Sequence, residues 1–229
     1  MTRHVTITTR CISNACLRTS LVIGALAFVS ALSAATAPAL GIAVTRKTVT
    51  VSNVPSGGSI VLFSCSRSSL YRSIAVKPEA RVLQDEDRDG VIRFALSIDI
   101  PLRSVWVAVD ETSGQTATAA PLGFPLLLSA IGETSFRKDV EGEIASLAVD
   151  LPRLVLLLVT PGKGAWLLTG FDGEASDRDG HSNGRVQLSF EDAKTIDGKD
   201  KAPKHIKKDD VVVAIDPGHL DVFVTQVGK

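Results

Sequence analysis

The sequence predicts an all-β protein built from two tandem, small β-sandwich domains of the immunoglobulin-like kind, and three observations support this fold class. Short β-branched segments bounded by Gly, Pro, Asn or Asp recur along the chain after residue 40. None of these segments shows the apolar period of a helix. Several of them return in the same order in the second half of the chain, which indicates an internal duplication.

The first domain is predicted over residues 41–125. Its expected strands are short apolar or β-branched runs: residues 48–54, 59–63, 91–96, 104–109 and 115–120. Turn residues separate these runs at the close spacing that is typical of a sandwich. A small barrel is the alternative architecture.

The predicted duplication rests on three pairs of segments. The pairs share glycines, prolines or apolar positions: 55–62 with 161–168, 89–96 with 183–190, and 105–110 with 211–216. In the second pair, Ile92 corresponds to Val186, and the alternating apolar residues indicate that each strand directs one face inward. The second domain is therefore predicted over residues 144–229, after a linker over residues 126–143.

Residues 1–40 have the features of an export signal. Three arginines precede the apolar run over residues 21–37: Arg3, Arg10 and Arg18. Small residues then offer three positions after which a signal peptidase could cleave: Ser33, Ala35 and Ala39. We therefore predict a signal peptide and a secreted or periplasmic protein, with no membrane span in the mature chain.

An uncleaved membrane anchor is the alternative for this N-terminal segment. No charged residue interrupts residues 19–45. A stretch of this length can cross a hydrocarbon core about 30 Å thick. On this alternative the protein stays attached to the membrane by its N-terminal segment.

Charge and cysteine content narrow the classes of function. The chain has 25 basic and 25 acidic residues, so no overall positive field attracts nucleic acid, and we predict no nucleic-acid partner. Cys11 and Cys16 precede the apolar run and would leave with the signal. Cys65 then has no disulfide partner, and its apolar neighbours predict a buried structural residue.

The segment LQDEDRDGVIRF (83–94) is the first candidate metal site. Asp85, Asp87 and Asp89 occupy alternate positions before Gly90, as in the opening of a calcium loop. The bidentate glutamate of such a loop is replaced by Leu96, so a complete EF-hand is excluded. Because Asp-Gly also favours a hairpin turn, a charged turn without metal is the alternative.

A second acidic loop occurs at the corresponding place in the other half. Its segment FDGEASDRDGHSNGR (171–185) supplies four oxygen-bearing side chains: Asp172, Asp177, Asp179 and Asn183. Crowded carboxylates repel one another, and Ca²⁺, which takes six to eight oxygen ligands, would offset this repulsion. Calcium is thus the one cofactor that the sequence suggests, with both acidic loops as candidate sites.

Catalytic motifs are absent from the sequence, which has no HExxH, GxSxG, CxxC or P-loop pattern. We therefore predict that the protein is not an enzyme. The alternative is a small hydrolase on the second domain, with His181 as a base oriented by Asp177 or Asp179. No nucleophile motif accompanies His181, so a polar turn residue is the simpler interpretation.

Two further features bear on partners. Trp106 and Trp166 would serve a carbohydrate-binding module if they were exposed, but their correspondence to Val212 and Ile60 favours apolar packing. The lysine-rich segment 194–208 is interpreted as a solvated loop, with an anionic polysaccharide or membrane surface as the alternative partner.

Together these features predict an exported, non-catalytic protein with a binding or structural role at the cell envelope or outside the cell. A polysaccharide and an envelope protein are the two classes of partner that suit such a protein. A carbohydrate-binding module is the main alternative function, and the small hydrolase is the other.

Overall fold

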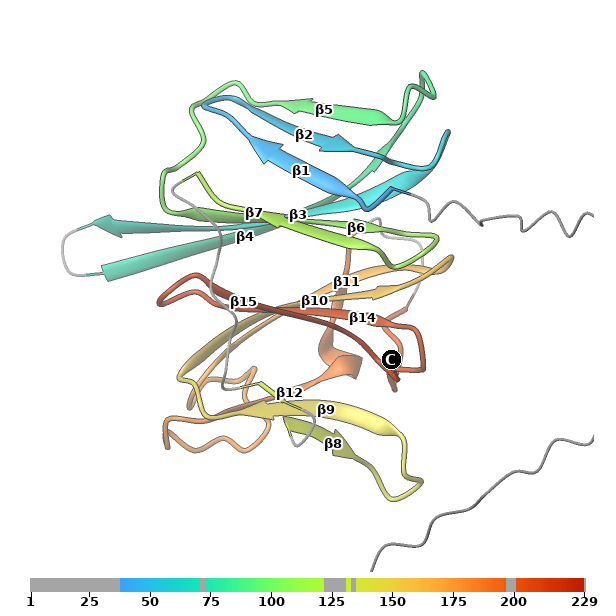
Figure 1. The fold of residues 1–229 in the computed structure, drawn as a ribbon. Helices are drawn as coiled ribbons and strands as arrows, with labels where there is room; N and C mark the ends of the chain where they lie inside the picture. Colours follow the sequence, from blue (N-terminus) through green and yellow to red (C-terminus); the bar gives the residue numbers. More distant parts are fainter. Residues whose placement is uncertain (1–37, 71–72, 122–130, 133–134, 197–200, 229) are drawn as a thin grey trace, which may run out of the picture. The chain divides into compact units, whose positions relative to one another are not determined.

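The computed structural model describes residues 38–70, 73–121, 131–132, 135–196 and 201–228. The predicted signal peptide lies almost entirely outside these residues, as do parts of the predicted linker and of the lysine-rich segment. Over the described residues the protein is all-β, with four antiparallel sheets (Figure 1). No helix in this part of the chain is long and apolar enough to cross a membrane.

Seven strands in the first half form two sheets. The three-stranded sheet has the order β1 (Gly41–Val44), β2 (Thr48–Ser52) and β5 (Val91–Ala95). The four-stranded sheet has the order β4 (Ser73–Gln84), β3 (Ser59–Leu70), β6 (Ser104–Asp110) and β7 (Thr116–Ala119). All five strands predicted for this half are therefore confirmed. Strands β1 and β4 were not predicted.

The second half also forms two sheets. The three-stranded sheet has the order β12 (Val186–Ser189), β9 (Ile144–Val149) and β8 (Phe136–Lys138). The five-stranded sheet has the order β13 (Lys194–Thr195), β11 (Gly164–Phe171), β10 (Arg153–Thr160), β14 (Val211–Asp216) and β15 (Asp221–Gln226). A short 3₁₀ helix, Phe190–Asp192, follows β12.

Strand pairing corrects one of the three sequence alignments. Strand β3 pairs with β4 and β6, and β10 pairs in the same way with β11 and β14. The alignment of residues 55–62 with 161–168 places β3 opposite β11 and is wrong, because β10 has the position of β3. Both segments carry a glycine-containing turn before an apolar strand. The sequence alignment matched these local features, which do not determine the strands with which each segment pairs. The other two alignments join strands with matching neighbours, β5 with β12 and β6 with β14.

The innermost strands are buried on both faces, which explains their unbroken apolar sequence. In β6, Val105, Val107 and Val109 enter one core cluster. Trp106 and Ala108, between them, enter another. Since side chains alternate across a strand, a strand with a core on each side needs apolar residues at every position. Strands β10 and β14 show the same two-sided burial.

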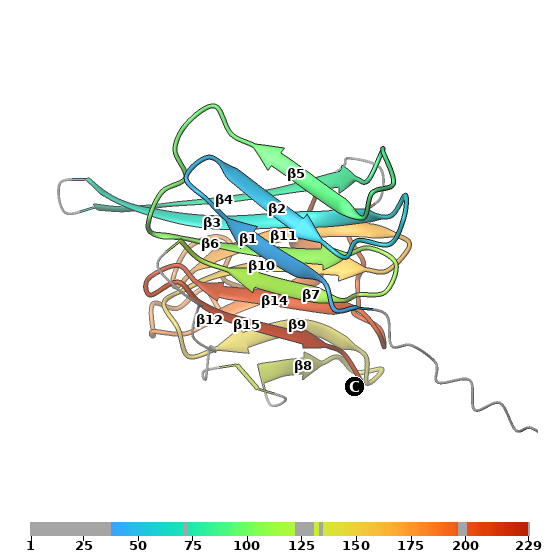
Figure 2. The same ribbon diagram turned by 45° about the horizontal axis from the view of Figure 1, so that its top comes forward.

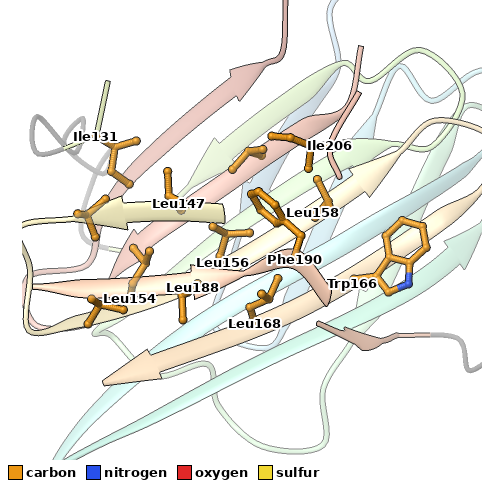
Figure 3. Packing of buried hydrophobic residues seen from close by; sticks show 14 residues of the cluster. Ile131, Leu147, Leu154, Leu156, Leu158, Trp166, Leu168, Leu188, Phe190 and Ile206 are labelled. Carbon is orange, nitrogen blue, oxygen red and sulfur yellow. The ribbon is translucent and has the colours of Figure 1, made fainter. Parts of the chain in front are cut away.

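The four sheets lie in layers (Figures 1 and 2), and three apolar clusters pack between them. The first lies between β1-β2-β5 and the sheet of β3 and β6, with Val49 and Leu62 among its residues. The third lies between the sheet of β10 and β14 and the sheet of β9 and β12. In this third cluster Phe190 lies among Leu147, Leu156 and Leu158 (Figure 3).

The middle cluster joins the two halves of the chain. Phe63 and Val107, from β3 and β6, share it with Leu157 and Val213, from β10 and β14. These four side chains have no exposed surface. Burying an aliphatic or aromatic side chain contributes about 1.5–3 kcal/mol, so this cluster provides a substantial part of the stability of both halves.

Candidate metal centre

The first acidic loop connects β4 to β5, and its first aspartate is buried. Asp85 directly follows β4, and its backbone N–H donates to the carbonyl of Gly58 at 2.9 Å. This bond ties the loop to the residue before β3. The side chain of Asp85 consequently turns inward, and the residue is only 2% exposed.

Backbone amides hold one oxygen of the buried carboxylate. Oδ2 of Asp85 accepts hydrogen bonds from the N–H groups of Gly57 and Gly90, each at 3.2 Å. Gly90 has a φ of 76°, a left-handed conformation that glycine adopts without strain. Gly90 thus supplies the positive φ expected of Asp-Gly, but the hairpin turn is not formed, because β4 pairs with β3 and β5 pairs with β2 in a different sheet.

The other two aspartates of the loop are exposed and bond to amides nearby. Oδ1 of Asp87 accepts from the N–H of Asp89 at 3.4 Å, and Oδ1 of Asp89 accepts from the N–H of Val91 at 2.7 Å. Oδ2 of Asp89 lies 3.1 Å from Nη1 of Arg93. The hydrogen bond from Arg93, with that from Val91, lowers the pKa of Asp89, so this carboxylate stays ionised in mild acid.

The structure brings the three predicted ligands of this loop together. One carboxylate oxygen from each of Asp85, Asp87 and Asp89 lies within 4.8 Å of the other two. Among the described residues, no other group of three metal-ligating side chains meets this condition. The alternate spacing in the sequence thus becomes a cluster of three acidic groups in space.

One oxygen of the Asp85 carboxylate is buried without a partner. Oδ1 of Asp85 is shielded from solvent and accepts no hydrogen bond from any described residue. An unsatisfied buried acceptor costs about 1–3 kcal/mol, and more when the group is charged. The loop therefore carries an unmet charged acceptor on one of the three residues of the acidic cluster.

The second acidic loop satisfies its equivalent aspartate completely. Asp172 directly follows β11, as Asp85 follows β4, and its backbone N–H donates to the carbonyl of Pro152 at 3.0 Å. Its Oδ1 accepts from the N–H of Asn183 at 3.0 Å and its Oδ2 from the N–H of Gly184 at 2.8 Å. Both oxygens of Asp172 are therefore occupied.

The remaining candidates of the second loop are also hydrogen-bonded. Asp177, which is buried, accepts from the N–H groups of Gly173 and Gln187 at 3.1 and 3.0 Å. Asp179 accepts from the N–H of His181 at 2.9 Å and from Nδ2 of Asn183 at 3.2 Å. A calcium site formed by Asp172, Asp177, Asp179 and Asn183 stays a prediction, and the hydrogen bonds already made account for these side chains.

The proposed catalytic histidine of the hydrolase alternative is an exposed side chain. Nδ1 of His181 lies 3.9 Å from Oδ1 of Asp179, beyond hydrogen-bonding distance, and the side chain is 81% exposed. Asp177, the other suggested partner, is directed to backbone amides. This geometry agrees with the interpretation of His181 as a polar turn residue.

Both tryptophans are buried, which removes the basis of the carbohydrate-binding alternative. Trp106 is 5% exposed, packs in the first cluster and donates from Nε1 to Oγ of Ser104 at 3.2 Å. Trp166 is 3% exposed and packs in the third cluster (Figure 3). Neither ring is a surface on which a sugar could stack, so the stacking hypothesis for these two residues is wrong.

The prediction for Cys65 is confirmed. The residue is free and fully buried in the middle cluster. Burial, together with the nearby negative charge of Asp216, raises the pKa of the thiol to about 12. Such a thiol is almost fully protonated at neutral pH and is a poor nucleophile.

Two histidine–carboxylate clusters were not predicted from the sequence. His205 lies between Asp139 and Glu143, and His219 contacts Asp216. The first cluster joins residues far apart in the chain, which no local pattern signals. The second was visible as a turn, DPGHLD, whose aspartate and histidine are three residues apart.

No protein-family model matches this chain, and no match was found among curated proteins.

Proposed function

We propose that this chain is an exported, non-catalytic protein of two immunoglobulin-like modules, with a binding or structural role at the cell envelope or outside the cell. The observation that carries the proposal is the middle cluster, in which β3 and β6 of one half pack against β10 and β14 of the other. A core shared by both halves fixes two sandwiches as one rigid body. Such a body is suited to spacing or presenting surfaces rather than to opening and closing around a substrate.

The matching strand neighbours of the two halves support the proposed duplication. The hairpin that follows β6 and the one that follows β14 also begin in the same way. Asp110 accepts from the N–H of Thr112 at 2.9 Å, and Asp216 accepts from the N–H of Gly218 at 2.7 Å. Two buried aspartates therefore shape corresponding turns at the ends of corresponding strands.

Polar contacts between the halves add to the apolar ones. The N–H of Gly162 donates to the carbonyl of Glu111 at 2.8 Å, which links the turn after β10 to the turn after β6. Nη1 of Arg67 donates to the carbonyl of Gly218, which links β3 to the turn after β14. Contacts at two separate places oppose rotation of one half on the other, in support of a structural role.

Export can be tested by expressing the full chain with a C-terminal tag, fractionating the cells and measuring the intact mass of the recovered protein. We expect an extracytoplasmic protein that has lost the residues before Ala34, Thr36 or Leu40. The control is a chain without residues 21–37, which should stay in the cytoplasm. Recovery of the full-length chain in the cytoplasm would contradict the proposal, and recovery of the full-length chain in the membrane would favour the anchor instead.

A further inference from the structure

We propose that the loop between β4 and β5 binds one Ca²⁺ ion through the carboxylates of Asp85, Asp87 and Asp89. This inference goes beyond the proposed function and does not depend on export. Clustered carboxylates alone are common on protein surfaces and do not make a site. This loop also has a buried carboxylate oxygen without a hydrogen bond, which is a second and independent observation.

Oδ1 of Asp85 is buried and accepts no hydrogen bond from the described residues, although the side chain is only 2% exposed. The chain supplies two amides to Oδ2 of the same carboxylate and none to Oδ1. A bare negative oxygen in such a place requires a cation, a proton or a donor to compensate it. Asp87 and Asp89 belong to the same cluster, so one divalent cation would offset the repulsion among all three carboxylates.

The second loop shows that the turn itself does not create the unmet oxygen. Asp172 also follows a strand and also receives an amide from a glycine, Gly184, in the loop before the next strand, yet both of its oxygens are bonded. The two loops differ at this aspartate. Asp85 is buried, belongs to a cluster of three acidic groups and has one oxygen without a hydrogen bond, whereas Asp172 is partly exposed and has both oxygens bonded.

The donor set selects the type of ion. All three ligands are anionic oxygens, which suit hard cations and not the softer metals that prefer imidazole or thiolate. Oxygens held at 2.3–2.6 Å from Ca²⁺ can be separated by up to about 5 Å, so the separations found here fit one coordination shell. Water can complete the six to eight ligands that Ca²⁺ takes. Mg²⁺ binds less well at a loop that lacks a fixed octahedron.

Arg93 competes with the ion for one ligand. Its Nη1 lies 3.1 Å from Oδ2 of Asp89 on the surface, where both side chains are partly exposed. Binding of Ca²⁺ would draw Asp89 away from this pair. The Arg93–Asp89 ion pair therefore lowers the affinity of the loop for Ca²⁺. Removing Arg93 should raise this affinity, so one variant is expected to gain binding while another loses it.

The experiment is a calorimetric titration of the metal-free chain with CaCl₂, together with melting curves in millimolar CaCl₂, in MgCl₂ and in chelator. We expect one ion per chain and a melting temperature several degrees higher in calcium than in chelator. Asp87→Asn should weaken binding about tenfold or more and remove most of the shift. Arg93→Gln should strengthen binding. Asp179→Asn, in the second loop, is the matched control and should leave both measurements unchanged.

The variants are chosen so that each result either supports or contradicts calcium binding at this loop. Asp87 is exposed and accepts only a long hydrogen bond at 3.4 Å, so Asp87→Asn should fold as the wild type does, which circular dichroism in chelator would verify. Coincident wild-type melting curves in calcium and in chelator would overturn the proposal. An equal shift with magnesium that persists in Asp87→Asn would also overturn it, because it would indicate a general ionic effect. Failure of export would leave the inference intact, since the titration measures only the purified chain.

Discussion

Nδ1 of His219 lies 2.6 Å from Oδ2 of Asp216, in the turn that connects β14 to β15. Asp216 is buried, whereas the ring of His219 is exposed at the surface. The same turn provides the carbonyl of Gly218 that receives Arg67 from the first half. A titratable group therefore lies next to one of the contacts between the two halves.

The hydrogen bond with Asp216, and then the charge of Asp216, raises the pKa of His219 above its ordinary value of 6.5. A histidine whose pKa is raised in the folded state stabilises that state fully below the unfolded pKa, and this contribution is lost as the pH rises through the folded pKa. We expect an NMR titration to show the raised pKa. Asp216→Asn should return the pKa towards 6.5, and an unchanged pKa in that variant would contradict the assigned cause.

The middle cluster should make the two halves unfold together. Trp106 packs in the first cluster and Trp166 in the third, so the variants Trp166→Phe and Trp106→Phe each leave one fluorescent probe in one half. We expect coincident urea transitions from the two probes. Transitions that differ in midpoint would show that the shared core does not couple the halves.

Truncating a side chain within the middle cluster should lower the free energy of unfolding. Leu157 has no exposed surface, so Leu157→Ala should lower the free energy of unfolding by about 2–5 kcal/mol. Val140→Ala is the matched control, because Val140 is fully exposed and its truncation should change stability by less than about 0.5 kcal/mol. Chemical denaturation of the three proteins measures both effects. A small loss for Leu157→Ala would contradict the assigned burial.

The thiol of Cys65 should react with an alkylating reagent only when the protein unfolds. Its pKa of about 12 and its complete burial both oppose attack on an alkylating reagent. In a chain that carries Cys11→Ala and Cys16→Ala, we expect alkylation at pH 8 to follow the rate of unfolding. Rapid labelling of the native protein would show that the residue is accessible after all.

The imidazole of His205 should hold the segment before β14 to the turn between β8 and β9. Its Nε2 lies 2.5 Å from Oδ2 of Asp139, and its Nδ1 lies 2.8 Å from Oε2 of Glu143. His205→Ala should therefore speed tryptic cleavage at the exposed lysines nearby, Lys204, Lys207 and Lys208. His181→Ala, which removes an exposed ring, is the control and should not change the cleavage rate.

The all-β class could be read from the sequence because strand signals are local. Segments such as VIRFA alternate in burial as the sequence predicts, with Ile92 inside and Arg93 outside. Strand β10, RLVLLLVT, was not predicted, because an apolar run without alternation does not distinguish a strand from other buried segments. Its alternate residues face two different clusters, and the second of these exists only once the two halves meet.

The candidate site was predictable to a similar extent. The spacing of Asp85, Asp87 and Asp89 indicated which residues would meet. The unmet oxygen was not predictable, because it depends on how the backbone of Gly57 and Gly58 approaches the loop from the start of β3. His205 and Asp139 are likewise distant in the chain and meet only in the folded protein, so no local sequence pattern encodes their contact.

The middle cluster also determines how the chain can be divided. Each half presents the inner face of its larger sheet to the other, with side chains such as Phe63 on one side and Leu157 on the other. A fragment cut between the halves would carry this face uncovered, and uncovered apolar faces of this kind drive self-association. A gene encoding one half alone would thus specify a chain with an uncovered apolar sheet face, which the other half covers in the full-length protein.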